Sequence, residues 1–251
     1  APECRIISPG LASRDVNYLN KLRELGAFPA FDAVSYHPYR TQTTPEDPDK
    51  MLTHWDPSAG TGTIFEEEAV MRRTAAADGV DRPLYVTEFS WRIHHPRLSV
   101  VSPERQAQYI VRYLAMAMAG HRRLFWYEFR HANFGKNGWS ILNPDNTPAP
   151  SLVAFQVFCR FLRGSRYESR KTDRDGIYQM NYRDRTGRAV AVVWTTRERS
   201  ALALTCGTPV EIRDIMGRKI RQTAAGEQLL LPLSENPLYL LGECESAIPV
   251  Q

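Results

Sequence analysis

The chain has 251 residues, 43% of them hydrophobic, so it can bury a full core in one large or two ordinary domains. Its net charge of +4 comes mainly from arginines dispersed among acidic residues, and the absence of a basic stripe argues against nucleic acid as a partner. No apolar run approaches the roughly 20 residues that span a bilayer, and the N-terminal residues lack a signal-peptide pattern, so no membrane partner is expected.

The first two thirds of the chain alternate short apolar runs with helical patterns. Residues 15–26, for example, carry Val16, Leu19, Leu22 and Leu25 at a helical period that a glycine closes. The predicted strands are 5–8, 31–36, 84–89 and 123–129, and the predicted helices are 15–26, 65–79, 102–119 and 150–162. Four successive strand-helix units predict parallel strands with covering helices, either in a doubly wound sheet or in part of an eight-fold barrel.

The pattern changes after Gly164. Short alternating runs separated by turn residues predict strands at 176–183, 188–196, 200–205, 209–214, 228–233 and 237–242. They predict a small antiparallel sheet domain. We therefore place a boundary near residue 165, with one domain over residues 1–164 and a second over residues 165–251.

The four cysteines do not have the spacing of a metal site. They lie far apart, without a Cys-x-x-Cys motif or a histidine cluster, so no metal and no cofactor is expected. Cys206 and Cys244 share the later domain and can pair in an oxidising compartment. Two buried free thiols are the prediction, because buried cysteine commonly acts as a small apolar residue.

The strand at 84–89 ends in an unusual residue for a buried run. The last but one residue of this strand is Glu88, which carries a carboxylate, and aromatic residues follow it at Phe89 and Trp91. Burying an isolated carboxylate is costly, so Glu88 requires hydrogen-bonding partners or a reaction that uses an ionised oxygen. A strand-end glutamate that is simply solvated is the alternative.

Aromatic and polar residues also follow the neighbouring strands. His37 and Tyr39 follow the strand at 31–36, Trp91 follows Glu88, and Trp126 ends the strand at 123–129. In parallel barrels the working residues lie at these carboxyl ends. Aromatic faces stack on sugar rings while polar groups bind hydroxyls, so the composition suggests a sugar pocket. A core role for Trp126 and a structural role for His37 remain the alternatives.

Residues 31–39, 84–89 and 125–127 resemble strands six, seven and eight of the clan A glycoside hydrolases, most closely family 39-like enzymes. The later domain resembles the accessory β-sandwich of that family through residues 191–195, 214–217 and 237–240. The resemblance implies an α/β chain made of the C-terminal portion of a (β/α)8 TIM-type barrel, strands five to eight, followed by a small antiparallel β-sandwich. It also implies a carbohydrate substrate and a secreted or periplasmic protein.

Site roles follow from the same resemblance. It implies that Glu88 is the nucleophile of a retaining glycoside hydrolase acting on a β-linked polysaccharide or oligosaccharide. Tyr39 would hydrogen-bond this nucleophile and His37 would contact sugar hydroxyls. Trp126 would floor the subsite next to the cleaved bond, with further stacking from Trp91 or Trp139.

One family feature is missing from this chain. Family members close strand four with an Asn-Glu motif that supplies the acid/base, and no Asn-Glu dipeptide occurs here. A retaining glycosidase needs two carboxyl groups about 5–5.5 Å apart. The acid/base glutamate can lie outside this chain, in the N-terminal half of the barrel or on a second chain. Alternatively Glu128 supplies it, although a salt bridge is the commoner role for such a residue, or the chain is a half-barrel that only binds glycans.

Missing strands have a physical consequence. Four strands cannot close a barrel, so the first strand and the strand at 123–129 would leave open edges with unpaired backbone groups. We expect the first strand to pair with a strand from outside residues 1–251, or with a second copy of this chain.

Overall fold

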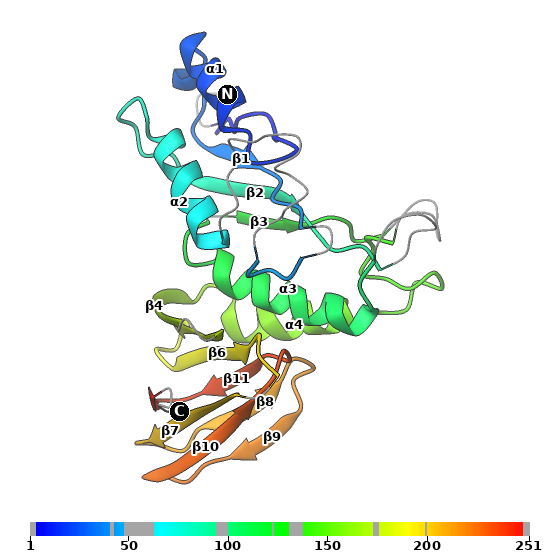
Figure 1. The fold of residues 1–251 in the computed structure, drawn as a ribbon, viewed down its shortest axis with the longest axis vertical. Coiled ribbons are helices and arrows are strands. Elements are labelled where there is room, and N and C mark those ends of the chain that lie inside the picture. The colour runs from blue at the N-terminus through cyan, green and yellow to red at the C-terminus, as the bar shows by residue number, and fades with distance from the viewer. Residues whose placement is uncertain are drawn as a thin grey trace. The chain divides into compact units, whose positions relative to one another are not determined.

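The computed structural model describes residues 4–40, 43–47, 63–93, 100–121, 123–130, 138–172, 176–198 and 200–247 (Figure 1). The chain divides into two compact units. Ala1–Ser102 with Met116–Thr147 form the first, here called the parallel-sheet unit, and Pro103–Ala115 with Pro148–Gln251 form the second, the two-sheet unit. The sequence division at residue 165 stays a prediction, since the compact units also group two helices before it with the later strands.

The parallel-sheet unit contains three parallel strands in chain order, β1 (Val34–Tyr36), β2 (Leu84–Phe89) and β3 (Arg123–Trp126). Its helices are α1 (Val16–Glu24), a 3-10 turn at Phe28–Ala30, and α2 (Ile64–Ala75). Helix α3 (Pro103–Ala117) lies between β2 and β3 in the sequence. Neighbouring parallel strands in sequence order are the arrangement that strand-helix units predict.

The predicted strand at residues 5–8 is corrected. This segment runs parallel to β1 but makes only two isolated bridges, Ile7 with Ala33 and Leu11 with Tyr36. Pro9 lies between the two bridges, and proline has no N–H to donate to a ladder. The segment is therefore placed where a fourth parallel strand would be, without forming a regular one.

The two-sheet unit is antiparallel. A six-stranded sheet has the order β4-β5-β6-β11-β8-β9 and a three-stranded sheet the order β10-β7-β12. The strands are β4 (Arg166–Thr172), β5 (Ile177–Arg183), β6 (Ala189–Thr195), β7 (Ser200–Cys206), β8 (Glu211–Asp214), β9 (Lys219–Gln222), β10 (Glu227–Leu233), β11 (Leu238–Leu241) and β12 (Glu245–Ala247). Helix α4 (Pro150–Leu162) belongs to this unit and packs Phe161 on Tyr239 of β11, with ring centroids 5.0 Å apart.

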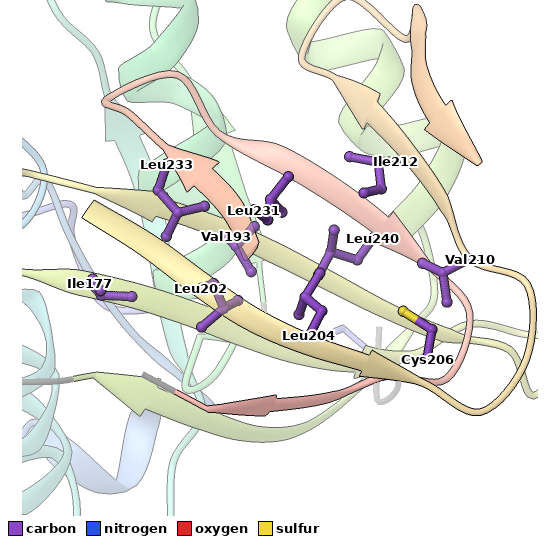
Figure 2. Packing of buried hydrophobic residues seen from close by; sticks show 10 residues of the cluster. All are labelled: Ile177, Val193, Leu202, Leu204, Cys206, Val210, Ile212, Leu231, Leu233 and Leu240. Atoms are coloured by element: carbon purple, nitrogen blue, oxygen red, sulfur yellow. The ribbon is translucent and has the colours of Figure 1, made fainter. Parts of the chain in front are cut away.

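The two sheets share one apolar core (Figure 2). Val193 and Leu240 come from the six-stranded sheet, and Leu204 and Leu231 come from the three-stranded sheet. Each is buried; β7 and β10 alternate buried with more exposed side chains, whereas β6 and β11 are buried on both faces. Burial of a Leu or Val side chain contributes about 1.5–3 kcal/mol, so this cluster is the main stabilising feature of the unit.

The prediction of two free thiols is wrong. Cys206 and Cys244 form a disulfide, with their Cα atoms 4.3 Å apart. Cys206 ends β7, and the strand pairing of β12 with β7 returns the chain beside it. The two cysteines are 38 residues apart and meet only because the strands pair, so the local sequence around each cysteine does not reveal the disulfide.

Three strands were missed because they are polar. β4, β9 and β12 have almost entirely exposed side chains and lie at sheet edges, where alternation of apolar and polar residues is not required. The other strands of this unit lie where the sequence predicts them, within a few residues.

Candidate active site

The carboxyl ends of β1 and β2 bring three predicted site residues together. Tyr36 pairs with Val86 in the parallel register, so the residues that follow each strand emerge at the same sheet edge. The Tyr39 hydroxyl donates a hydrogen bond to Glu88 Oε2 at 2.7 Å. His37 Nδ1 lies 3.5 Å from the same carboxylate oxygen. Two neighbouring groups thus converge on one oxygen of Glu88, whose side chain is 35% exposed.

The ring of His37 is held from its other side. His37 Nε2 lies 3.0 Å from Thr87 Oγ1, and the backbone N–H of His37 donates to Leu11 at 2.8 Å. A Cβ at Gly10 would lie 2.7 Å from His37 Nε2, closer than real Cβ contacts allow. Gly10 is therefore a supporting residue that the sequence did not reveal, because a Pro-Gly pair is typical of any chain reversal.

Burial shapes the protonation of both neighbours of Glu88. Burial lowers the pKa of His37, and the charge of Glu88 opposes that effect only in part. Burial, together with the hydrogen bond to Glu88, raises the pKa of Tyr39. His37 is therefore neutral and Tyr39 is a protonated donor at neutral pH, which suits a carboxylate that accepts hydrogen bonds.

Aromatic rings line one side of this group. The ring of Tyr39 lies 5.3 Å from Trp139 and 6.4 Å from Tyr127, and Tyr127 lies 6.5 Å from Trp139. Trp139 is partly exposed, and Tyr127 is 37% exposed. These open ring surfaces next to a carboxylate can stack on a sugar. Tyr127 directly follows Trp126 in the aromatic run of the predicted strand at 123–129.

Trp126 supports this wall as well as lining it. Its indole N–H donates to the carbonyl of Trp139 at 3.2 Å, and its ring packs 5.3 Å from Phe89. Trp126 is partly buried. Trp126 thus connects β3 to the segment that carries Trp139, and its ring keeps some accessible surface.

The predicted stacking role of Trp91 is corrected. Its side chain is 1% exposed, its indole N–H donates to the carbonyl of Thr43 at 3.0 Å, and its ring packs 6.4 Å from Trp126. A ligand cannot stack on a ring without accessible surface. The aromatic run after Glu88 gave no sign of which ring would turn inward, and Trp91 packs beneath Trp126 instead.

Arg92 is a further residue that sequence reasoning missed. Its guanidinium lies 4.3 Å from the ring centroid of Trp139, a cation–π contact that holds the indole from one face. The neighbouring backbone is also fixed, since the N–H of Ile93 donates to Gly138 at 2.7 Å. Burial lowers the pKa of Arg92, yet an arginine stays charged under all ordinary conditions.

Glu128 lies close enough to affect two site tyrosines. Burial raises the pKa of Tyr127, and the charges of Glu128 and then Glu88 add to that shift. Glu128 also contributes to the raised pKa of Tyr39. Its backbone N–H donates to Trp139 at 3.4 Å, and the peptide bond before it is cis. Two carboxylates therefore act on the same hydroxyl groups.

The described part of the chain holds no cluster of three or more histidine, cysteine, aspartate or glutamate side chains that could bind a metal. Within the same residues, no helix has the length and apolar character needed to cross a membrane. The sequence predicts a long loop at 38–63 and another at 131–146; most of the first and residues 131–137 of the second lie outside the described residues.

Several solved structures are similar to this chain. A family 39 glycoside hydrolase from the gut symbiont Bacteroides cellulosilyticus WH2 matches with a TM-score of 0.69 and 21% identity, over 90% of this chain and 47% of that chain. The GH51 arabinofuranosidase from Xanthomonas axonopodis pv. citri has a TM-score of 0.60 and 12% identity, over 94% and 57%. The catalytic domain of GH30 xylanase C from Talaromyces cellulolyticus has a TM-score of 0.58 and 12% identity, over 95% and 52%.

This chain shares its fold with glycoside hydrolases. It spans about half the length of these three solved chains. No family model and no curated protein matches it. At such low identity the likeness concerns the fold, and the assignment of chemistry to residues depends on the geometry of the site.

Proposed function

We propose that this chain is part of a retaining glycoside hydrolase of clan A, family 39-like, with Glu88 as its nucleophile. The observation that carries the proposal is the convergence of Tyr39 Oη, at 2.7 Å, and His37 Nδ1, at 3.5 Å, on one oxygen of Glu88. Partly exposed aromatic rings lie beside Tyr39, on one side of this group, as a sugar-binding site requires. The substrate class is a β-linked polysaccharide or oligosaccharide.

The proposed reaction uses Glu88 to attack the anomeric carbon of the sugar. The bond to the leaving oxygen breaks as the bond to the Glu88 carboxylate forms, and water later releases the sugar from this glycosyl-enzyme intermediate. Tyr39 orients the attacking carboxylate by its hydrogen bond. His37 Nε2 faces Thr87, so the Nδ1 edge beside Glu88 is the part of the neutral ring that would meet a sugar hydroxyl. Tyr127, Trp126 and Trp139 supply the stacking surface.

The acid/base belongs, in this proposal, to a segment outside residues 1–251. The three similar solved chains are about twice as long as the part that this chain matches. β3 lies at the edge of the parallel sheet, and Phe125 and Phe129 are 52% and 61% exposed there. An N-terminal half of the barrel would pair with the open edges, cover these rings and bring the second carboxylate.

Two alternatives remain open to experiment. Together with burial, the charges of Glu128 and Glu88 raise the pKa of the same tyrosine hydroxyls, so Glu128 is a candidate acid within the described residues. The chain can also be a glycan-binding half-barrel without activity, since the aromatic rings serve binding as well as catalysis.

A mechanism-based 2-fluoro sugar tests the nucleophile on the complete enzyme. Mass spectrometry should find one adduct, on the peptide that contains Glu88, and Glu88→Gln should remove both adduct and turnover while glycan affinity changes little. Glu104→Gln, at an exposed position of α3, is the matched control and should retain full activity. An active Glu88→Gln enzyme, or an adduct elsewhere, would contradict the assignment.

The same assay separates the two candidate acids. Loss of the acid/base slows hydrolysis of substrates with poor leaving groups most, and azide restores turnover because it needs no proton removed. We expect Glu128→Gln to leave this profile unchanged. Azide-rescued activity of Glu128→Gln would instead make Glu128 the acid.

We also propose an oxidising compartment, secreted or periplasmic. The disulfide between Cys206 and Cys244 supports it, because such bonds persist outside the reducing cytosol.

A further inference from the structure

The two sheets of the two-sheet unit have different sizes, and part of the larger sheet stays uncovered. β7 is flanked only by β10 and β12, while six strands form the opposing sheet. The shared apolar core uses Ile177 at one end of β5, but the later residues of the same strand face, Gln179 and Asn181, are polar. A pocket of about 240 Å³ lies over this polar end.

Small side chains form the floor of the pocket. In the β5–β6 register Asn181 pairs with Ala191 and Arg183 with Ala189, and Ala191 pairs with Leu240 of β11. Gly242 follows the end of β11, and its N–H donates to the carbonyl of Ala189 at 2.9 Å. Alanine and glycine at adjacent positions leave a hollow that larger residues would fill. The polar wall consists of Glu168, Ser169, Lys171, Gln179, Asn181, Arg183 and Glu243.

The charged groups of this wall already have partners. Arg183 binds both carboxylate oxygens of Glu168, at 3.1 and 3.2 Å, and also pairs with Glu243. Lys171 Nζ donates to the carbonyl and the hydroxyl of Ser246, each at 3.0 Å. Two cations and two anions therefore balance, and none is left to select a charged ligand.

The amides have an unmet hydrogen bond. Gln179 is 4% exposed, and its Nε2 donates to Asn181 Oδ1 at 2.8 Å, while Asn181 Nδ2 donates to Ser169 Oγ at 3.0 Å. Gln179 Oε1 is buried and accepts no hydrogen bond from the protein. An unsatisfied buried acceptor costs about 1–3 kcal/mol, so it calls for an explanation.

This chain of amides can run in either direction. If both amides turn over, the Ser169 hydroxyl donates to Asn181, Asn181 donates to Gln179, and an N–H of Gln179 becomes the unpaired group. One polar atom of Gln179 stays unpaired in both arrangements. That unpaired atom has no accessible surface, so a ligand would meet the chain at the partly exposed Asn181 amide and the exposed Ser169 hydroxyl. Because the two amides can turn over together, these groups offer a donor or an acceptor, and a sugar hydroxyl is both.

We propose that this pocket is a second carbohydrate-binding site, which takes one uncharged sugar ring through the Gln179–Asn181–Ser169 amide chain. Its volume lies below the about 300–1,000 Å³ of pockets for drug-sized ligands, which fits a single ring. The wall is polar without a free charge, as a neutral polyhydroxylated ligand requires. The site contains no part of the Glu88 group and does not depend on the chemistry proposed there.

Side-chain amide resonances of the 15N-labelled full-length protein test the site directly. D-xylose, L-arabinose, D-glucose and D-galactose are titrated separately to millimolar concentrations, and these monosaccharides contain no bond for a glycosidase to cleave. At least one should shift the NH2 signals of Gln179 and Asn181 in a saturable manner. No saturable shift with any of the four would overturn the proposal.

Two variants and a control locate the binding. Ala191→Leu fills the hollow without removing a polar atom, and Gln179→Leu removes the unpaired amide; each should weaken the sugar affinity by about tenfold or more. Gln228→Leu, at an exposed position of β10 away from the pocket, should bind as the wild type does. Unchanged affinity in both pocket variants would contradict the proposal, whereas labelling of Glu88 by the fluoro sugar is unaffected by either result.

Discussion

The strands of the two units are paired and covered in different ways. In the two-sheet unit, antiparallel strands surround one apolar core and a disulfide joins β7 to the residues before β12. Among the described residues of the parallel-sheet unit, three strands pair, β3 lies at an edge, and the residues at the carboxyl ends form a group around Glu88. Stability and chemistry are therefore divided: one unit completes its own core, while the other keeps polar and aromatic surface open at the site.

The largest expected effect concerns the disulfide. Replacing Cys206 and Cys244 together by serine should lower the free energy of unfolding of the two-sheet unit by about 4 kcal/mol, the loop-closure entropy expected for their separation of 38 residues. Hydrogen exchange should report the loss in β7 and β11 but leave β2 protected. The control Cys159→Ala removes an unpaired cysteine of the same unit and should cost about 1 kcal/mol. Equal loss of protection in β2 would mean that the two units unfold together.

The next effect concerns the site of the parallel-sheet unit. Tyr39→Phe deletes the hydrogen bond to Glu88, and such a bond to a charged group contributes about 1.5–3 kcal/mol. In the complete enzyme kcat/KM should fall by about 10- to 100-fold with little change in stability. Tyr85→Phe, on the same sheet, is the control. A Tyr39→Phe enzyme with wild-type kcat/KM would remove the proposed orienting role.

Between pH 7.5 and 5, acid should weaken the parallel-sheet unit more than the two-sheet unit, because all six histidines fall within the sequence ranges of the former. His121 donates from Nδ1 to the carbonyl of Ala117 at 3.0 Å, so its Nε2 accepts from the Tyr36 hydroxyl at 2.7 Å, and the ring is neutral. Burial lowers the pKa of His121, and the charge of Glu68 opposes this only in part.

Protonation of His121 makes the free energy of unfolding depend on pH. The folded pKa of His121 lies below the unfolded value of about 6.5, so the unfolded state binds more protons as the pH falls. The stabilisation is fully present above pH 6.5 and is lost as the pH falls toward the folded pKa, by at most about 1.4 kcal/mol per pH unit for one histidine. Urea unfolding from pH 7.5 to 5 measures it. His121→Gln should flatten this slope, and an unchanged slope would assign the effect to His37 or another group.

The smallest effect tests the open edge. Phe125 and Phe129 are exposed on and after β3, and each half-exposed ring should contribute about 1 kcal/mol to association with whatever covers that edge. The isolated chain should therefore exceed 28.6 kDa in light scattering, and Phe125→Lys with Phe129→Lys should shift it toward the monomer. Ile220→Lys changes a similarly exposed residue on β9 and should not. A stable wild-type monomer would contradict the predicted need for a partner strand.

The sequence alone supported most of the elements and the centre of the candidate site. Apolar periodicity is a local signal, so it predicted β1, β2 and the helices, together with most strands of the two-sheet unit. It also brought His37, Tyr39 and Glu88 to one sheet edge, since consecutive parallel strands carry their carboxyl ends to the same side. The polar edge strands β4, β9 and β12 lacked that signal and were missed.

Tertiary structure alone decided which neighbours these residues acquire. Cys206 pairs with Cys244, and Gly10 supports His37, across long stretches of sequence. The burial of Trp91 depends on which way its side chain turns, and local sequence does not determine that. Arg92 came to lie on Trp139 for the same reason. Local patterns record whether a residue favours a strand, a helix or a turn, whereas the contact that fixes a side chain depends on where the whole chain brings its partner.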